Sequence, residues 1–235
     1  MKTRTTVSFL ALLVLAFTGA GAQPAIAAGG AVVSGKVTLS SAAPAMAKIK
    51  MNADSVCLQQ HKDAVMTQDV VANGSNLQYA LVYVDGVTGS YPAPANAVTL
   101  TQIGCMYEPH LFAAQVGQKV TIINNDGTLH NVNCQATTNK KFNLAQPVKG
   151  MKTDKVFDQP EIGIPLKCNV HPWMHAVGAI FAHPFFAVTG ADGSFSIKGL
   201  PAGKYTLKVW HEKLGTKSQE ITVTEGETKS VNFSL

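Results

Sequence analysis

Hydrophobic and polar residues alternate along much of this chain with a period of two. The alternation is clearest at residues 78–84 and 116–124, while 31–40 is rich in valine and 177–181 is a short apolar run. Patterns of this kind predict β-strands with at least one buried face. The only helical pattern covers residues 54–62, where Asp54 is placed to cap a turn or two. Short strands separated by glycine and proline therefore favour an all-β fold built from sandwiches.

After residue 183 the chain has a different pattern of apolar runs and turn residues. Residues 185–197 contain two apolar runs on either side of Asp192 and Gly193, which predicts a hairpin with a turn at those two positions. Further alternating segments continue to Leu235. This region therefore predicts a second, smaller group of strands.

The first residues have the form of a secretory signal peptide. Lys2 and Arg4 precede an apolar run at 7–17, and small residues at 20–22 and 25–27 both fit a cleavage site. We assign residues 1–27 to this signal. The apolar run is too short to span a bilayer comfortably, and no later segment approaches the necessary length. The mature chain is expected to be soluble and either periplasmic or secreted; a membrane-anchored precursor is the alternative.

Charge gives little direct information about function. The net charge of +5 falls by two when Lys2 and Arg4 are removed, which leaves a mildly basic chain. Six lysines gather in one part of the sequence: Lys140, Lys141, Lys149, Lys152, Lys155 and Lys167. They form a solvated face or steer an acidic redox partner. Aromatic residues do not interleave with them, so no nucleic-acid partner is expected.

The candidate chemistry lies in residues 168–174, where Cys168, His171 and Met174 follow one another at short spacing. His130, at the end of an alternating strand and a polar turn, offers a second imidazole. Two imidazoles, a thiolate and a thioether form the ligand set of a mononuclear electron-transfer copper. Zinc is the main competitor, but a thioether is a poor zinc ligand. A Cys–His nucleophile lacks an orienting third group.

These two segments together resemble the cupredoxins, the small blue copper proteins, and the short ligand loop is most similar to that of amicyanin. The likeness covers roughly residues 98–182 and includes the strand and turn at 107–117. It implies a Greek-key sandwich holding one type 1 copper ion. The equatorial ligands would be His130, Cys168 and His171, with Met174 axial. Asn131 would bond the ligand loop close to the sulfur.

The resemblance also implies where an electron leaves the site. In the family the loop histidine reaches the surface inside an apolar patch, so His171 would be the exit and Pro172 and Trp173 the patch. Trp173 is otherwise an ordinary packed aromatic residue. His175, which directly follows Met174, departs from the amicyanin-like pattern. It is either an exposed histidine or a competitor for the axial position.

Four cysteines have to be placed in an oxidising compartment. With Cys168 given to the metal, Cys57 and Cys105 are the expected disulfide, and Cys134 is left free or buried. A second metal site is the rival interpretation. It would use Cys57, Cys105 and two histidines, His61 and His110.

The region after residue 183 resembles the carboxypeptidase regulatory-like, transthyretin-like β-sandwich. The likeness rests on two runs, one from Asp192 to Ile197 and one from Leu200 to Leu207. Because about fifty residues bury little core, we expect residues 31–97 to combine with 183–235 in one sandwich into which the copper domain, 98–182, is inserted. The alternative is a cupredoxin at 31–182 with an N-terminal extension, followed by a separate sandwich at 183–235.

These features predict an exported one-electron carrier whose partners are other redox proteins and which turns over no substrate. A copper storage or delivery protein is the alternative. A cell-surface binding module with a structural metal is a third possibility, in which His211 and Glu212 form the only suggestive polar pair. The oligomeric state is left open.

Overall fold

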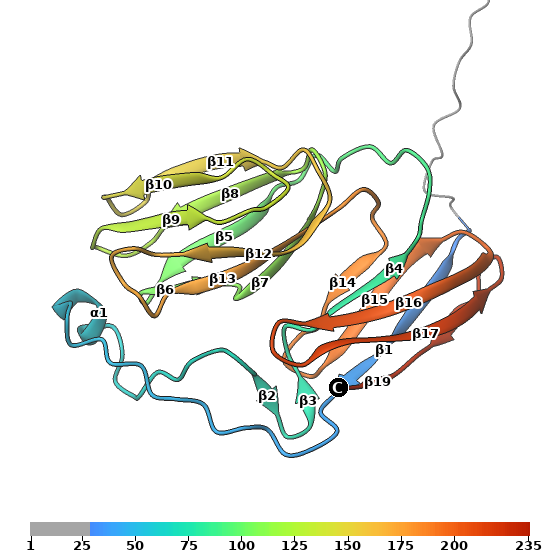
Figure 1. Cartoon of the computed structure of the whole chain (residues 1–235), viewed down its shortest axis with the longest axis horizontal. Helices are drawn as coiled ribbons and strands as arrows, with labels where there is room; N and C mark the ends of the chain where they lie inside the picture. The colour runs from blue at the N-terminus through green and yellow to red at the C-terminus, as the bar shows by residue number, and fades with distance from the viewer. Residues whose placement is uncertain (1–28) are drawn as a thin grey trace, which may run out of the picture.

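The computed structural model describes residues 29–235, and the predicted signal peptide at 1–27 lies outside them. The predicted all-β class is confirmed, since strands form nearly all of the regular structure in this range (Figure 1). The helix expected at 54–62 is present but shorter, as α1 (Ser55–Gln59). Asp54 caps it by accepting a hydrogen bond from the Val56 N–H at 2.8 Å. No helix in the described part of the chain has the length and apolarity of a membrane span.

Ten strands form a first pair of sheets, which we call the terminal sandwich. One sheet has β1 at its centre and contains β1 (Ala31–Thr38), β2 (Ala72–Asn73), β3 (Asn76–Leu77), β15 (Ser194–Leu200), β18 (Thr228–Ser230) and β19 (Phe233–Ser234). The other has the order β14-β4-β16-β17 and contains β4 (Leu81–Asp85), β14 (Phe186–Val188), β16 (Gly203–His211) and β17 (Gly215–Val223).

The remaining nine strands form the central sandwich. Its five-stranded sheet has the order β10-β9-β12-β13-β7, with β7 (Leu111–Gln115), β9 (His130–Cys134), β10 (Phe142–Gln146), β12 (Glu161–Lys167) and β13 (His175–Phe181). Its four-stranded sheet has the order β11-β8-β5-β6, with β5 (Val98–Ile103), β6 (Met106–Glu108), β8 (Lys119–Asn124) and β11 (Lys152–Val156).

The strands of the central sandwich, β5 to β13, form one continuous stretch of the chain. The chain passes from β4 to β5 and returns from β13 to β14, so the strands before and after the central sandwich share two sheets. Figure 1 shows the result as two bodies side by side, one running from green through yellow to light orange and the other blue to green before it and orange to red after it. The strands of the central sandwich thus lie between two stretches of chain that pair with each other.

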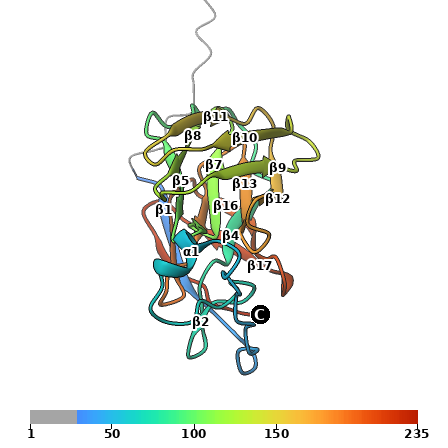
Figure 2. The same ribbon diagram turned by 90° about the vertical axis from the view of Figure 1, so that its left-hand side faces the viewer.

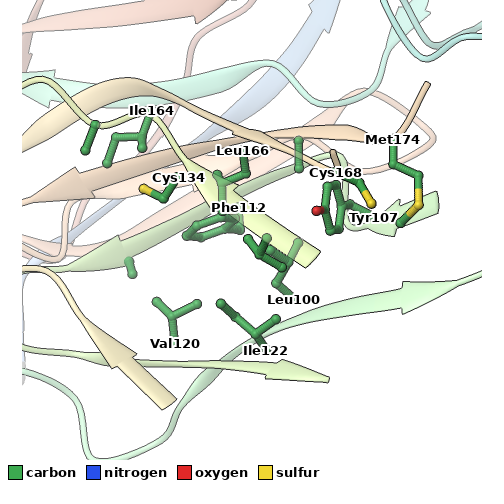
Figure 3. Close-up of a cluster of buried hydrophobic side chains, with 14 of the residues drawn as sticks. Leu100, Tyr107, Phe112, Val120, Ile122, Cys134, Ile164, Leu166, Cys168 and Met174 are labelled. Atoms are coloured by element: carbon green, nitrogen blue, oxygen red, sulfur yellow. The ribbon is translucent and has the colours of Figure 1, made fainter. Parts of the chain in front are cut away.

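Each sandwich has its own apolar core because alternate strand residues point inward. In β8 the inward positions include Val120 and Ile122, both about 1% exposed, as the alternation at 116–124 predicted. Figure 3 shows the central core, with Cys168, Met174 and Tyr107 at one end of the cluster. The candidate ligands therefore lie at the edge of a packed core.

A third apolar cluster joins the two sandwiches. It contains Leu81 and Tyr79 from the terminal sandwich and Leu111, Val177 and Phe181 from β7 and β13 of the central one. All five side chains are buried. The two bodies are therefore packed together through apolar side chains rather than connected only by the chain.

The segment that carries α1 leaves the terminal sandwich and packs on the central one. Ile49, Met51 and Cys57 belong to the central core, and Val65 packs against it. Figure 1 shows α1 at the end of the central sandwich near β6, and Figure 2 shows it below β5. Residues 49–65 thus differ from the rest of 31–97, with which the sequence had grouped them.

The hairpin expected at 185–197 is not formed, so that prediction was wrong. β14 pairs with β4 and β15 pairs with β1, which places the two strands in different sheets. The turn itself is present, with Gly193 at φ +73°. Thr189 explains the difference, because its backbone N–H donates to Ala80 O at 2.8 Å and its hydroxyl donates to Leu77 O at 2.7 Å. These long-range bonds direct the chain from one sheet to the other.

Candidate metal centre

Strand pairing brings the two halves of the candidate site together. β12 runs antiparallel to β9, with Leu166 opposite Cys134 and Lys167 opposite Asn133. The same register, continued beyond β12, places Cys168 opposite Val132 and Asn169 opposite Asn131, next to His130, the first residue of β9. Residues far apart in sequence therefore meet at one end of the five-stranded sheet.

Three of the four candidate donors converge on one point. The Nδ1 atoms of His130 and His171 are 2.9 Å apart, and the Cys168 Sγ lies 3.9 Å from His171 Nδ1. Two nitrogens bound to one metal ion at about 2.0 Å each would stand roughly 3 Å apart, and a sulfur at about 2.3 Å would lie slightly farther from them. The donor arrangement therefore fits a single small metal ion.

Met174 closes the loop that holds these donors. Its backbone N–H donates to His171 O at 2.9 Å, and its carbonyl accepts from the Cys168 N–H at 3.1 Å. Its side chain is fully buried, and Figure 3 shows it at the same end of the core as Cys168. The backbone of Met174 is thus held next to that of Cys168, and its role as the axial ligand stays a prediction.

A carboxylate holds the outer nitrogen of each imidazole. His130 Nε2 lies 2.8 Å from Asp126 Oδ2, and His171 Nε2 lies 3.0 Å from Asp54 Oδ2. A ring that donates its Nε2 proton to a carboxylate has a free lone pair at Nδ1, so both rings point a basic nitrogen inward. The two carboxylates select the tautomer that a metal ion needs.

The sequence did not reveal these two carboxylates. Asp126 lies four residues before His130 in the chain. This short separation was the only sign in the sequence that its carboxylate could reach the His130 ring. Asp54 was recognised only as a helix cap, and it lies 117 positions from His171 in the chain. No local pattern could link the two.

Asn131 ties the ligand loop to β9. Its side-chain carbonyl accepts a hydrogen bond from the Asn169 N–H at 2.6 Å and lies 3.5 Å from Cys168 Sγ. Its amide donates to Asn143 Oδ1 at 2.6 Å. The geometry matches the role that the resemblance gave to this residue. A further bond, from the His171 N–H to Cys168 Sγ at 3.4 Å, helps to fix the sulfur.

These contacts favour the charged forms of the buried groups. Burial raises the pKa of Cys168, but hydrogen bonds from His130 and from backbone N–H groups of the loop hold it below its usual value. Burial lowers the pKa of His130, but hydrogen bonds to Asp126 and Cys168 raise it to about 9. In the chain by itself these contacts favour a proton on His130 and ease the loss of the Cys168 proton, and a metal cation would compete with the proton on His130.

The position of His171 differs from the expectation. The ring was expected at the surface as the exit for an electron, but it is only 2% exposed. The α1 segment covers it, with Cys57 Sγ 3.5 Å from Nε2 in addition to Asp54. The expectation failed because a chain segment that belongs to no cupredoxin-like pattern packs over the loop.

The ring of Trp173 packs beside that of His171. Its ring centroid is 5.1 Å from that of His171, and its indole N–H donates to Cys105 O at 3.0 Å. The residue is half-buried. Pro172, which was expected in the same patch, is exposed.

Cys57 and Cys105 are joined by a disulfide, the pairing expected from the sequence. The rival metal site of Cys57, Cys105, His61 and His110 is not assembled. The sulfurs are bonded to each other, His61 Nε2 bonds to Gly104 O at 2.7 Å, and His110 contacts Glu212 instead. Cys134 is buried and free of any disulfide within residues 29–235.

His175 is the first residue of β13 and does not join His130 and Cys168 in one cluster of donors. It is half-buried and packs edge-on against His110, with 4.9 Å between ring centroids.

Five of the six clustered lysines are exposed, and Lys155 lies over the Phe142 ring.

Comparison with known proteins gives matches to both kinds of sandwich. Residues 182–235 match the carboxypeptidase regulatory-like domain. A search of curated proteins gives no match.

Solved structures similar to part of the chain include three copper proteins. A purple cupredoxin from Nitrosopumilus maritimus is 21% identical, with 35% of this chain and 98% of that one covered and a TM-score of 0.31. A copper(I) form of an amicyanin mutant is 22% identical, with 42% and 97% covered and a TM-score of 0.33.

The third is a copper-containing nitrite reductase from Thermus scotoductus SA-01. It is 20% identical, with 41% of this chain and 24% of that one covered and a TM-score of 0.34. This chain therefore spans about a quarter of the reductase. Both families that the sequence resembles are represented among these matches.

Proposed function

We propose that the chain is an exported type 1 copper protein that carries single electrons between periplasmic redox partners and turns over no substrate. The observation that carries the proposal is the approach of His130 Nδ1 and His171 Nδ1 to 2.9 Å, with Cys168 Sγ 3.9 Å from the latter. Met174, buried at the same end of the core, would supply the weak fourth ligand. A soft thiolate and thioether favour Cu(I), while two imidazoles keep Cu(II) acceptable.

The surrounding residues suit this role because they hold one geometry. Asp126 and Asp54 fix the two rings, and Asn131 fixes the loop at Cys168. Copper, when bound, would supply the exchange of one electron between its two valences. A rigid ligand set keeps the rearrangement between those valences small, which is what an electron carrier requires.

Burial of the ligands favours a carrier over a delivery protein. His130, Cys168, His171 and Met174 are each no more than 4% exposed. An ion held by such residues is shielded from exchange with chelators. A storage or delivery protein would instead need an exchangeable site.

The test is the visible spectrum of the chain reconstituted with Cu(II). We expect an intense visible band that bleaches with a reductant and returns with an oxidant. Cys168→Ser should remove the band, because the thiolate is the source of the charge transfer, whereas Cys134→Ser should retain it. A colourless metal that a chelator removes within minutes would instead support delivery, and no copper binding at all would refute both.

A further inference from the structure

A second cluster of metal-ligating side chains lies where the two sandwiches meet. It consists of His110, between β6 and β7, His175, at the start of β13, and Glu212, in the turn between β16 and β17. One ring nitrogen of each histidine and a carboxylate oxygen of Glu212 all lie within 4.8 Å of one another. None of these residues belongs to the His130–Cys168–His171 centre.

The two imidazoles come from the central sandwich and are held in place independently. The Val177 N–H donates to His110 O at 2.8 Å, which fixes His110 against β13. His175 Nδ1 lies 3.2 Å from Trp173 O, so this nitrogen carries the ring proton and donates it. The proton on Nδ1 leaves the lone pair of His175 on Nε2, the arrangement in which histidines bind metals.

The carboxylate comes from the terminal sandwich. Glu212 Oε1 contacts His110 Nε2, and Glu212 Oε2 lies 3.9 Å from Lys213 Nζ. Lys213 is also paired with Asp69 at 3.0 Å, so it does not neutralise Glu212 alone. The carboxylate of Glu212, from the terminal sandwich, therefore faces the two imidazoles of the central sandwich.

His110 is not fully satisfied by its contact with Glu212. The ring is 2% exposed, and its Nδ1 has no hydrogen-bond partner in the described part of the chain. Buried polar atoms are nearly always paired, so an unpaired ring nitrogen calls for an explanation. A ligand bound at Nδ1 would provide one.

We propose that His110, His175 and Glu212 bind a divalent transition-metal ion of the Zn²⁺ type. Two imidazoles and one carboxylate suit such an ion and leave a fourth position open. Glu212 and His175 are partly exposed, which gives the ion a way in and the open position contact with water. Because the ligands come from both sandwiches, the ion would also link the two bodies.

The test is the number of Zn²⁺ ions that the purified chain binds in equilibrium dialysis. His175→Ala and Glu212→Gln should each lose one equivalent, or weaken it at least tenfold. The matched controls, His61→Ala and Glu220→Gln, should retain it. Cys168→Ser should also retain it, which separates this site from any zinc held by the buried thiolate.

Two further measurements use the unsubstituted chain and so do not depend on how the variants fold. Zn²⁺ at a hundredfold excess over Kd should raise the Tm by roughly 5 °C, since it binds only the folded chain. It should also protect His175 from diethylpyrocarbonate, as measured by peptide mass spectrometry. Equal zinc binding by the chain and both site variants, or no protection at saturation, would overturn the proposal and leave His110–Glu212 as an ion pair.

Discussion

At the scale of single residues, the centre depends on how each donor is held as much as on its identity. His130 and His171 each present Nδ1 to the site because a carboxylate binds Nε2. Asn131 bonds the loop at Asn169 and approaches the Cys168 sulfur. The local pattern in the sequence identified the candidate donors, since their types and spacing lie within two short segments, and the structure brings His130, Cys168 and His171 together. The pattern did not predict Asp54, which chain topology alone brings to His171.

Met174 offers a direct test at this scale. Met174→Leu removes the thioether while keeping a buried apolar side chain of similar size, so copper should still bind. Loss of a weak donor to the metal should raise the reduction potential. We expect a rise of at least about 59 mV, the equivalent of a tenfold change in a one-electron equilibrium. Voltammetry of the reconstituted chain measures this, and Met151→Leu, outside the loop, is the control. An unchanged potential would show that Met174 is not a ligand.

At the scale of elements, α1 and its disulfide form a cover over His171. Asp54 reaches the ring from the start of the helix, and Cys57 joins the helix to Cys105 in the turn between β5 and β6. The sequence predicted both the helix and the pairing of the cysteines. It did not predict that the helix lies on the metal loop, because that contact depends on the path of residues 49–65.

Replacement of both Cys57 and Cys105 by alanine tests this cover. The bridge closes a separation of 48 residues, so its loss should lower the free energy of unfolding by up to about 4 kcal/mol in the chain-entropy model. The ring of His171 should also become more accessible to a small soluble oxidant, and electron exchange should accelerate. Urea unfolding and stopped-flow oxidation measure the two effects. Asp54→Ala keeps the disulfide, so it shows which part of the effect comes from the Asp54 carboxylate and which from the disulfide.

A second element-scale prediction concerns Glu161, which fixes the turn after β9 to β12. Its carboxylate accepts hydrogen bonds from the Thr137 hydroxyl at 2.9 Å and from the Asn139 N–H at 2.8 Å. Burial raises its pKa, but these and related bonds lower the pKa to about 2, below the usual 4.5. A lowered pKa means that the stabilisation is complete above about pH 4.5 and is lost as the pH falls towards 2.

Glu161→Gln should therefore destabilise the chain by about 2 kcal/mol at pH 7, the scale of hydrogen bonds to a charged group. The difference from the unsubstituted chain should shrink between pH 4.5 and pH 2. Urea unfolding at a series of pH values measures it, and Glu225→Gln is the control. A difference that stays constant with pH would contradict the assignment.

At the scale of the whole molecule, the apolar cluster between the sandwiches couples their stability. Leu111 of β7 is 2% exposed and packs in the same cluster as Tyr79 and Phe181. Leu111→Ala should cost about 3 kcal/mol, as is usual for a buried leucine. In calorimetry the unsubstituted chain should unfold in one transition. Two separate transitions that shift independently in the variant would show that the bodies are not coupled.

The sequence predicted the all-β class and the two kinds of sandwich because strand periodicity and ligand spacing are local properties. The pairing of strands is not local, as the Asp192–Gly193 turn shows. Its residues favour a hairpin, yet Thr189 bonds to Ala80 and Leu77 and sends β15 to the other sheet. The cluster of His110, His175 and Glu212 could not be predicted from the sequence either, because its members lie in three separate parts of the fold.

The path of residues 49–65 affects any attempt to isolate the central sandwich. A fragment cut at 98 and 182 would keep His130, Cys168, His171 and Met174 but would lack both Asp54 and Cys57. Its loop histidine would face water without a carboxylate, and Cys105 would become a reactive thiol beside the centre. Excision would thus give a more open and more oxidant-sensitive molecule, so a fragment that keeps this centre closed must also contain residues 49–65.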